Sequence, residues 1–179
     1  TAKKKENMEL VVGALRTLHN SDIKMENRFN VFEKIEEYES LVKKVNGTLF
    51  EDYYEIKTRV LKLEKVLEDH GMEIKPCHND TVPENFVKDI NERMYLIDWE
   101  YSGLNDPMWD LAAHSIECDF SENDEELFLN LYFNNLIEDK HKIRILVYKI
   151  CQDFLWSIWT ILKEAQGDDF GTYGIDRYN

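Results

Sequence analysis

Apolar residues recur at the three- and four-residue spacing of an α-helix through most of this chain, and this periodicity constrains the fold more than any other feature. Near the start of the chain the periodicity forms three stripes, over 8–20, 30–47 and 48–71. Each stripe predicts an amphipathic helix that buries one face. The first 70 residues or so are therefore expected to be helices joined by short polar segments.

Residues typical of helix ends flank the second and third stripes. Two capping-box spacings mark their starts, Asn30 with Glu33 and Thr48 with Glu51. In such a box a side chain accepts a hydrogen bond from the backbone of the first helical turn. Gly47 and Gly71 mark the predicted ends, because glycine readily adopts the left-handed conformation that closes a helix.

Helical patterns return in the second half of the chain. Pro107 suits the first turn of a helix, where its missing N–H costs nothing. Ser121 with Asp124 predicts the start of another helix. The last long helix is expected over 142–167, and it is apolar on nearly every face. A helix of that kind is predicted to be central.

The helical pattern stops between residues 72 and 101. Pro76 and Pro83 break any helix, and two short β-type runs follow over 85–90 and 94–98 with a polar turn between them. These runs predict a small hairpin. The expected fold class is therefore mainly α with a small β-hairpin, in a single domain over 1–179.

Composition excludes several classes of function. Twenty-two Lys and Arg against 36 Asp and Glu give a net charge of −14, which disfavours binding to nucleic acid or to anionic membranes. No apolar run approaches the roughly 18 to 20 residues that a membrane helix needs. The three cysteines, at 77, 118 and 151, show no C-x-x-C spacing, which fits a reducing cytoplasm and argues against a zinc site.

The strongest chemical signal is the pattern H-x-D-x-x-x-x-N formed by His78, Asp80 and Asn85, followed after the hairpin by Asp98. Kinase-type phosphoryl transfer needs a carboxylate that takes the proton of the attacking hydroxyl, and an amide and a second carboxylate that hold Mg²⁺ on the nucleotide phosphates. Because the hairpin folds back on itself, Asp98 is expected to return beside Asn85. Oxygen ligands of this kind suit Mg²⁺ better than zinc.

Structural alternatives exist for these residues. The spacing D-x-x-x-x-N also arises by chance, since Asp and Asn are common turn residues. His78 is interpreted as a packed residue that fixes the loop and not as a catalytic group. A thiol–imidazole pair of Cys77 with His78 is rejected, because neighbouring residues in an extended segment point to opposite faces.

The motifs resemble the choline/ethanolamine kinase family, and most closely its bacterial members. The resemblance rests on 78–85, 97–102, Asp106-Pro107 with 110–112, and the aromatic segment 154–159 with Phe170-Gly171. It covers essentially the whole chain. It implies the C-terminal, larger and mainly helical lobe of a fold like that of protein kinases and aminoglycoside phosphotransferases, acting with ATP and Mg²⁺ to convert choline to phosphocholine.

The resemblance also implies roles for individual residues. Asp80 would be the catalytic base, and Asn85 and Asp98 would bind Mg²⁺ and through it the nucleotide. Glu100 would brace the loop and Asp110 would anchor it.

A choline pocket is implied as well, lined by Tyr101, Glu117, Trp156, Trp159, Phe170 and Tyr173. A quaternary ammonium has no N–H to donate, so aromatic faces and carboxylates bind it. The alternative is that Trp156 and Trp159 are core residues of a buried helix, which periodicity alone does not exclude.

The chain departs from the family pattern on the nucleotide side. It contains no G-x-G-x-x-G and no strand-embedded lysine, so the smaller nucleotide-binding lobe is expected to be absent and the chain alone to be weakly active or inactive. Three alternatives stay open: another acceptor such as ethanolamine or an aminoglycoside, a non-catalytic helical module that binds a quaternary ammonium, and homodimerisation.

Overall fold

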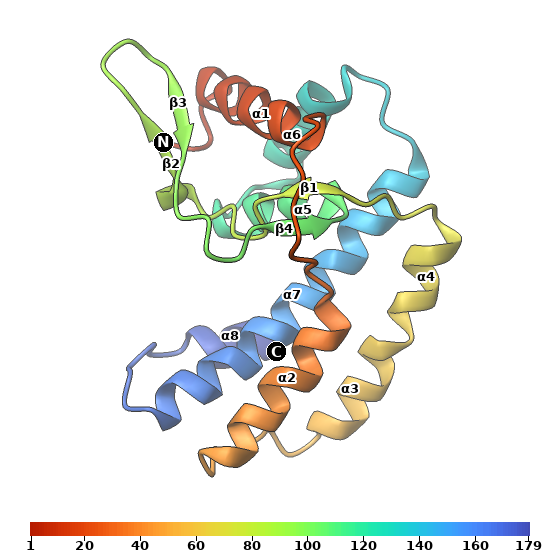
Figure 1. The fold of residues 1–179 in the computed structure, drawn as a ribbon, viewed down its shortest axis with the longest axis vertical. Helices are drawn as coiled ribbons and strands as arrows, with labels where there is room; N and C mark the ends of the chain where they lie inside the picture. The colour runs from red at the N-terminus through yellow and green to blue at the C-terminus, as the bar shows by residue number, and fades with distance from the viewer. The chain divides into compact units, whose positions relative to one another are not determined.

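The computed structural model describes all 179 residues and is mainly helical, with two short antiparallel strand pairs (Figure 1). The elements in chain order are α1 Lys5–His19, α2 Val31–Lys44, α3 Tyr53–Leu61, α4 Leu63–Asp69, β1 Lys75–Cys77, the 3₁₀ helix η1 Pro83–Asn85, β2 Phe86–Lys88, β3 Met94–Leu96, β4 Gly103–Asn105, α5 Pro107–Glu117, α6 Glu122–Phe133, α7 Asp139–Ala165 and α8 Tyr173–Tyr178.

The contacts divide the chain into two compact units, each built from two segments. The first unit comprises 1–29 and 70–146, and the second comprises 30–69 and 147–179. The division falls within α7. The prediction of a single domain over 1–179 stays a prediction.

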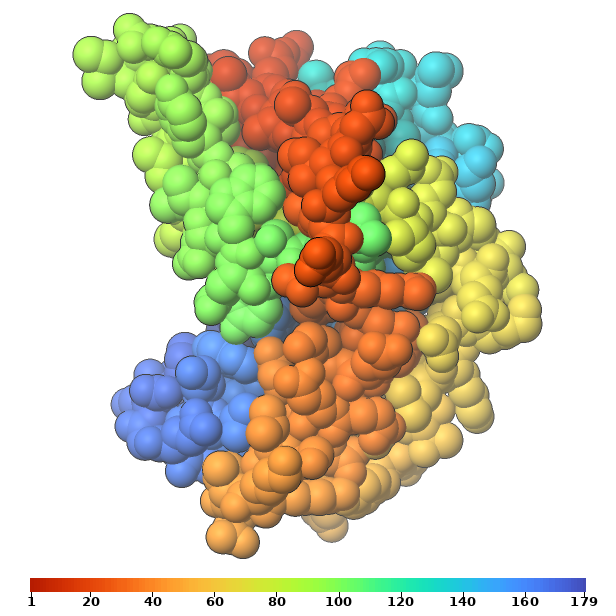
Figure 2. Space-filling view, in the orientation of Figure 1, coloured from red at the N-terminus to blue at the C-terminus, as the bar shows by residue number.

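The first unit contains all of the strands. β2 and β3 pair as the predicted hairpin, with Val87 opposite Tyr95, although both strands are shorter than the sequence indicates. Figure 2 shows the hairpin projecting from the surface, and Ile90 near its tip is 97% exposed. The second pair, β1 with β4, was not predicted and places Pro76 opposite Leu104.

Gly103 makes a close approach between two segments possible. It begins β4, and a Cβ atom at this position would lie 2.9 Å from the backbone oxygen of Asn27. The neighbouring Leu104 N–H donates to that same oxygen at 2.8 Å, and the Phe29 N–H donates to the Leu104 oxygen at 3.0 Å. The chain that follows α1 is thereby fixed against β4.

The predicted starts of α5 and α6 are confirmed. Pro107 stands in the first turn of α5, where the Asp106 side chain caps the helix by accepting the N–H of Met108. Ser121 and Asp124 form a reciprocal capping box at the start of α6. Residues 107–115 are all buried, so α5 is the central helix of the first unit.

The second unit contains α2, α3, α4, α8 and the C-terminal part of α7. Its core includes Ile35, Val42, Tyr53, Phe154 and Ile158, all below 9% exposure. The rings of Tyr53 and Phe154 stack with their centroids 5.4 Å apart, which joins α3 to α7. As predicted, Asn30 caps α2, accepting hydrogen bonds from the Phe32 and Glu33 N–H groups.

Three details of the predicted helices are wrong. The capping box of Thr48 with Glu51 does not form, because the helix begins later, at Tyr53. Its stripe is divided at Lys62 into α3 and α4. The left-handed residue after α2 is Asn46, with φ 55°, and not Gly47. Gly71, with φ 70°, does follow α4 as predicted.

The expectation that no segment is long and apolar enough to cross a membrane is also wrong. One helix, α7, meets that test by length and composition. Of its most apolar 18-residue window, 61% is buried inside the protein. Burial of this kind explains the apolar composition, so the helix is weak support for a membrane span.

Candidate active site

The loop between β1 and η1 carries the motif found in the sequence, and most of it is buried. His78, Asn79 and Thr81 are each 0% exposed, whereas Asp80 between them keeps partial exposure. The loop is therefore anchored by buried residues on both sides of Asp80, whose side chain remains partly accessible. This is the arrangement expected for a reactive group held by a rigid scaffold.

The carboxylate of Asp110, on α5, binds the backbone of the loop. One oxygen accepts the N–H of His78 at 2.9 Å and the other accepts the N–H of Asn79 at 2.8 Å. His19, at the end of α1, lies 3.0 Å from the first of these oxygens through its Nε2. The predicted anchoring position of Asp110 therefore corresponds to two direct hydrogen bonds to the loop backbone.

Asn79 connects the loop to its surroundings. Its backbone is left-handed, with φ 69°. Its amide nitrogen donates to the backbone oxygen of Tyr101 at 3.0 Å, and its amide oxygen accepts from Asn105 at 2.9 Å. Its backbone oxygen accepts from the indole of Trp109 at 3.0 Å.

The far end of the loop returns to Asp80 through Asn85. The Asn85 amide nitrogen donates to the backbone oxygen of Asp80 at 2.9 Å and to its carboxylate oxygen Oδ2 at 3.0 Å. The backbone oxygen of Asn85 accepts the N–H of Ile97 at 3.0 Å. Asp98 is the next residue in the chain, so this hydrogen bond brings its segment to Asn85. The structure thus brings Asp80, Asn85 and the segment carrying Asp98 together.

The electrostatic surroundings of Asp80 are acidic. Burial raises the pKa of its carboxyl, and the hydrogen bond from Asn85 opposes that rise. The nearby charges of Asp98 and Glu100 raise the pKa further. A cation placed among these three carboxylates would relieve their repulsion.

His78 packs in the way that the sequence interpretation described. Its Nε2 lies 2.8 Å from the backbone oxygen of Ile97, and its ring meets the edge of Trp99 at 4.8 Å between centroids. His78 therefore links the loop to the strand end that carries Asp98. Its Nδ1 is buried without a hydrogen-bond partner.

The donor set at Asn85 and Asp98 fits a hard cation. Because the Asn85 amide nitrogen is engaged with Asp80, its amide oxygen points away from that residue and is the atom able to bind metal. Asp98 is exposed and left-handed, with φ 62°, so its carboxylate is accessible. An amide oxygen and a carboxylate are ligands that Mg²⁺ accepts.

The residues of the predicted choline pocket are distributed between the two units. In the second unit, the rings of Trp156 and Trp159 meet at 6.1 Å between centroids, and Trp159 meets Phe170 at 4.9 Å. Both tryptophans are only partly buried, so neither is enclosed in the core. Tyr173 begins α8, with the Arg177 guanidinium over its ring at 5.0 Å.

The two remaining pocket residues belong to the first unit. Tyr101 lies two residues before β4, and its backbone oxygen accepts a hydrogen bond from the Asn79 amide, so it is fixed to the loop. Glu117 ends α5, about 10 Å along that helix from Asp110. The two therefore lie in different parts of the first unit.

Sequence reasoning missed His19 and His114. His19 reaches Asp110 across 91 residues of chain, and His114 Nδ1 lies 2.9 Å from the backbone oxygen of Thr81. Burial lowers the pKa of His114 to about 4, so its neutral ring is a donor to the residue after Asp80. His114 stands four residues after Asp110, on the same helix face, which was the available signal.

Comparisons with known proteins place the chain in a family. The family model for choline/ethanolamine kinase matches residues 1–179. Protein LicA of Haemophilus influenzae is 36% identical over 179 residues, covering 93% of this chain and 64% of that protein. The crystal structure of choline kinase LicA from Streptococcus pneumoniae superposes with a TM-score of 0.85 at 43% identity, over 97% of this chain and 61% of that chain.

A more distant structure shares the fold alone. An aminoglycoside phosphotransferase from Streptomyces rimosus superposes with a TM-score of 0.62 at 20% identity, over 86% of this chain and 63% of that one. The predicted fold class, the large helical lobe of a kinase-like fold, is confirmed by these likenesses. This chain spans less than two thirds of the length of each protein compared. It belongs to the choline/ethanolamine kinase family.

Proposed function

We propose that the protein carrying this chain transfers the γ-phosphoryl group of ATP to the hydroxyl of choline, giving phosphocholine. In this proposal the chain supplies the catalytic and choline-binding residues and is weakly active or inactive without a nucleotide-binding lobe. The observation that carries the proposal is the double hydrogen bond from Asn85 to Asp80 beside the strand end with Asp98. Membership of the choline/ethanolamine kinase family supports it.

Asp80 is the residue proposed to act on the acceptor. Its carboxylate oxygen Oδ2 is held by Asn85, and the raised pKa of this partly exposed group makes it a better proton acceptor than an ordinary aspartate. It would orient the choline hydroxyl and take its proton as the bond to phosphorus forms. Asp110 and His114 keep its backbone in place on either side.

Asn85 and Asp98 are proposed to hold Mg²⁺. When bound there, Mg²⁺ would supply positive charge that offsets the charge of the ATP phosphates. The chain's own contribution is the Asn85 amide oxygen, oriented by the hydrogen bonds that the amide nitrogen donates to Asp80, and the Asp98 carboxylate, exposed at a left-handed residue.

The quaternary ammonium of choline is proposed to bind on aromatic faces. Trp156, Trp159 and Phe170 form a contiguous, partly exposed cluster in the second unit. Rings of this kind each contribute about 0.5–2 kcal/mol to binding a desolvated cation. A primary ammonium would gain less there, because it requires hydrogen-bond acceptors.

Steady-state kinetics of the full-length protein tests the proposal. Choline, ethanolamine and an aminoglycoside are compared as acceptors with ATP and Mg²⁺, for the wild type, Asp80→Asn and the matched surface control Glu84→Gln. We expect choline to give the highest kcat/KM, Asp80→Asn to lower kcat by about a thousandfold or more with choline affinity changed only a few-fold, and Glu84→Gln to be active.

Other outcomes would contradict specific parts of the proposal. If ethanolamine or an aminoglycoside gave a higher kcat/KM than choline, that compound would be the preferred acceptor in place of choline. A fully active Asp80→Asn variant would remove Asp80 from its role. Saturable choline binding by calorimetry, together with no turnover of any acceptor by the full-length protein, would favour a non-catalytic binding module.

A further inference from the structure

The first unit contains a cavity of about 110 Å³ that includes neither Asp80, Asn85 nor Asp98 in its lining. Its walls come from the end of α1, the segment leading into β1, the start of α5, the end of α6 and the start of α7. The acidic and basic residues of its lining are His19, Glu73, Lys75, Asp106, His141 and Arg144, of which Asp106 is already paired with Arg144. A cavity of this size has room for several waters or for one small polar ligand.

Arg144 on α7 is a buried cation that lines this cavity. It is 1% exposed, and its Nη1 donates to the backbone oxygen of Gly71 at 2.7 Å and to Asp106 at 3.2 Å. Its Nε is buried and has no hydrogen-bond partner in the protein. A buried guanidinium N–H without an acceptor is costly, so a partner from the cavity is expected.

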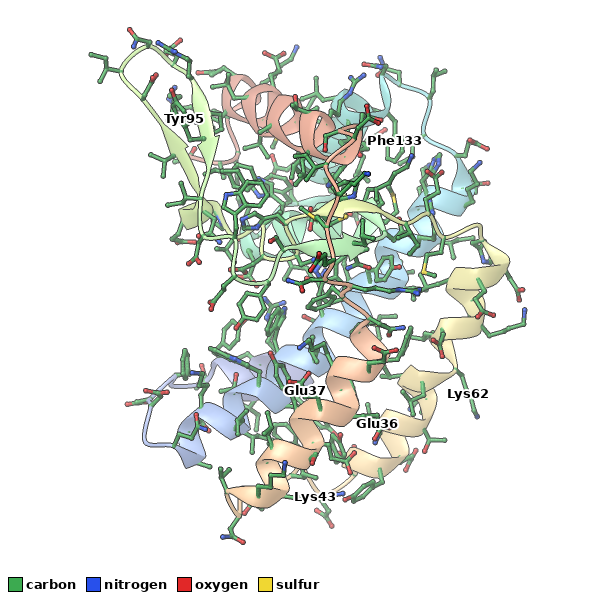
Figure 3. The ribbon with its side chains drawn as sticks, viewed as in Figure 1. Glu36, Glu37, Lys43, Lys62, Tyr95 and Phe133 are labelled. Carbon is green, nitrogen blue, oxygen red and sulfur yellow. The ribbon has the colours of Figure 1, made fainter.

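His141 supplies a second donor. Its Nδ1 accepts the backbone N–H of Glu138 at 3.1 Å, so the proton of the neutral ring is on Nε2. Its ring stacks on Phe133 at 4.4 Å between centroids, and Phe133 projects from the end of α6 (Figure 3). Burial and the charge of Arg144 lower the pKa of His141, which keeps the ring neutral at ordinary pH.

Two residues near the rim of the cavity carry opposite charges. Lys75, at the start of β1, is partly exposed and adds a mobile ammonium group. Glu73, two residues earlier, is exposed, and its negative charge opposes part of the lowering of the His141 pKa. Lys75 would attract an anion in the cavity and Glu73 would repel it.

A metal ion is a poorer occupant. Ligand atoms of His19, Cys77 and Asp110 lie within 4.8 Å of one another next to the cavity. Burial raises the pKa of the Cys77 thiol well above its usual range, so the thiol stays protonated. Both Asp110 oxygens already accept backbone N–H groups. Both ring nitrogens of His19 are also engaged, Nε2 with Asp110 and Nδ1 with the Tyr132 hydroxyl at 2.7 Å. This cluster is internally paired and is assigned no cation.

We propose that the cavity binds a small tetrahedral oxyanion of the class of inorganic phosphate or a phosphate monoester, through the Nε–H of Arg144, the Nε2–H of His141 and the ammonium of Lys75. Two fixed donors and one mobile cation match the several acceptor oxygens of such an ion. The two cations of the lining, Lys75 and Arg144, balance its two carboxylates, Glu73 and Asp106, so the cavity lacks the excess negative charge that the net charge of −14 gives the chain as a whole. The proposal does not rest on the proposed function.

The test follows the side-chain Nε–H signal of Arg144 by ¹H–¹⁵N NMR, assigned by its loss in Arg144→Lys. Inorganic phosphate and methyl phosphate are titrated separately, with sodium chloride at matched ionic strength as the reference. We expect a saturable shift with at least one phosphate probe in the millimolar range and none with chloride. A stronger response to methyl phosphate identifies a monoester as the preferred ligand, and a stronger response to phosphate identifies the free ion.

Charge variants at the rim, with phosphate binding measured by isothermal titration calorimetry, make the test independent of the Arg144 signal. Lys75→Gln is expected to weaken phosphate binding about threefold and Glu73→Gln to strengthen it by about the same factor, while the exposed Lys62→Gln in the second unit has no effect. The proposal is overturned if no probe gives a saturable shift, if chloride gives the same shift, or if the rim variants and the control bind alike. Because the rim side chains are accessible, these variants test the site even if Arg144→Lys does not fold.

Discussion

The side-chain amide of Asn85 donates to both the backbone oxygen and the carboxylate oxygen of Asp80, at 2.9 and 3.0 Å. One amide group thus fixes the position of the Asp80 backbone and the orientation of its side chain. The same residue accepts the N–H of Ile97 through its backbone, which ties the hairpin to the loop. Asn85 therefore ties Asp80 to the segment with Asp98, in addition to the contact of His78 with the backbone oxygen of Ile97.

Replacement of Asp80 is expected to stabilise the fold near pH 7. Burial raises the pKa of Asp80 in the folded state, so its contribution to stability is fully present below the unfolded pKa of about 4 and is lost as pH rises through the folded value. Asp80→Asn should therefore have a larger free energy of unfolding than the wild type near neutral pH, with the difference shrinking in acid. Urea denaturation measures this difference. A destabilised Asp80→Asn at neutral pH would contradict the prediction, and Glu84→Gln serves as the control.

Asp110→Asn is expected to lower the free energy of unfolding by about 3 kcal/mol. The two Asp110 oxygens accept the backbone N–H groups of His78 and Asn79, and in the variant an amide N–H₂ would face one of these two donors. Chemical denaturation measures the loss. Asp119→Asn, at an exposed carboxylate, is the matched control and should change stability by less than about 0.5 kcal/mol. Equal effects of the two substitutions would show that Asp110 does not anchor the loop.

His114 predicts a loss of stability in acid. Its pKa is about 4 when folded and about 6.5 when unfolded, so the unfolded state binds more protons between these values and stability falls as pH falls through this range. The loss due to His114 is at most about 3 kcal/mol. His114→Asn keeps an N–H near Thr81 but does not titrate, so its free energy of unfolding should change less between pH 6.5 and 4. Parallel pH profiles of variant and wild type would refute the assignment.

Two glycines of the first unit are predicted to respond oppositely to alanine. In Gly103→Ala the new Cβ would lie 2.9 Å from the Asn27 backbone oxygen, and we expect a loss of about 1–3 kcal/mol. In Gly13→Ala, within α1, nothing lies within 4 Å of the new Cβ, and we expect a gain of about 0.5–1 kcal/mol. Thermal unfolding of both variants measures the signs. A stable Gly103→Ala would mean that the segment at Asn27 can move away.

Local patterns predicted the local structure well. The capping residues of α2 and α6 and the first-turn proline of α5 are visible within four residues of sequence, and the hairpin is visible from two apolar runs around a polar turn. Each depends on interactions between near neighbours in the chain. The break at Lys62 was missed because the apolar stripe continues through it, and only the backbone changes direction.

Distant pairings could not be predicted in the same way. β1 and β4 are three-residue strands separated by more than 20 residues, and one contains Pro76 while the other begins with Gly103. The contact of His19 with Asp110 depends on how α1 packs, which no local pattern encodes. The roles of Asp80, Asn85 and Asp98 came from a motif and a resemblance, and they stay predictions until kinetics tests them.

Asn79, next to the proposed catalytic residue Asp80, is a position at which the chain has little freedom to vary. Glycine would accept the left-handed backbone but would break the links to Tyr101 and Asn105. Aspartate would keep the shape but could not donate to Tyr101, and larger side chains would strain the backbone inside a fully enclosed position. Substitutions at the neighbouring residues can therefore be compared with one another while the backbone at Asn79 stays in the same position.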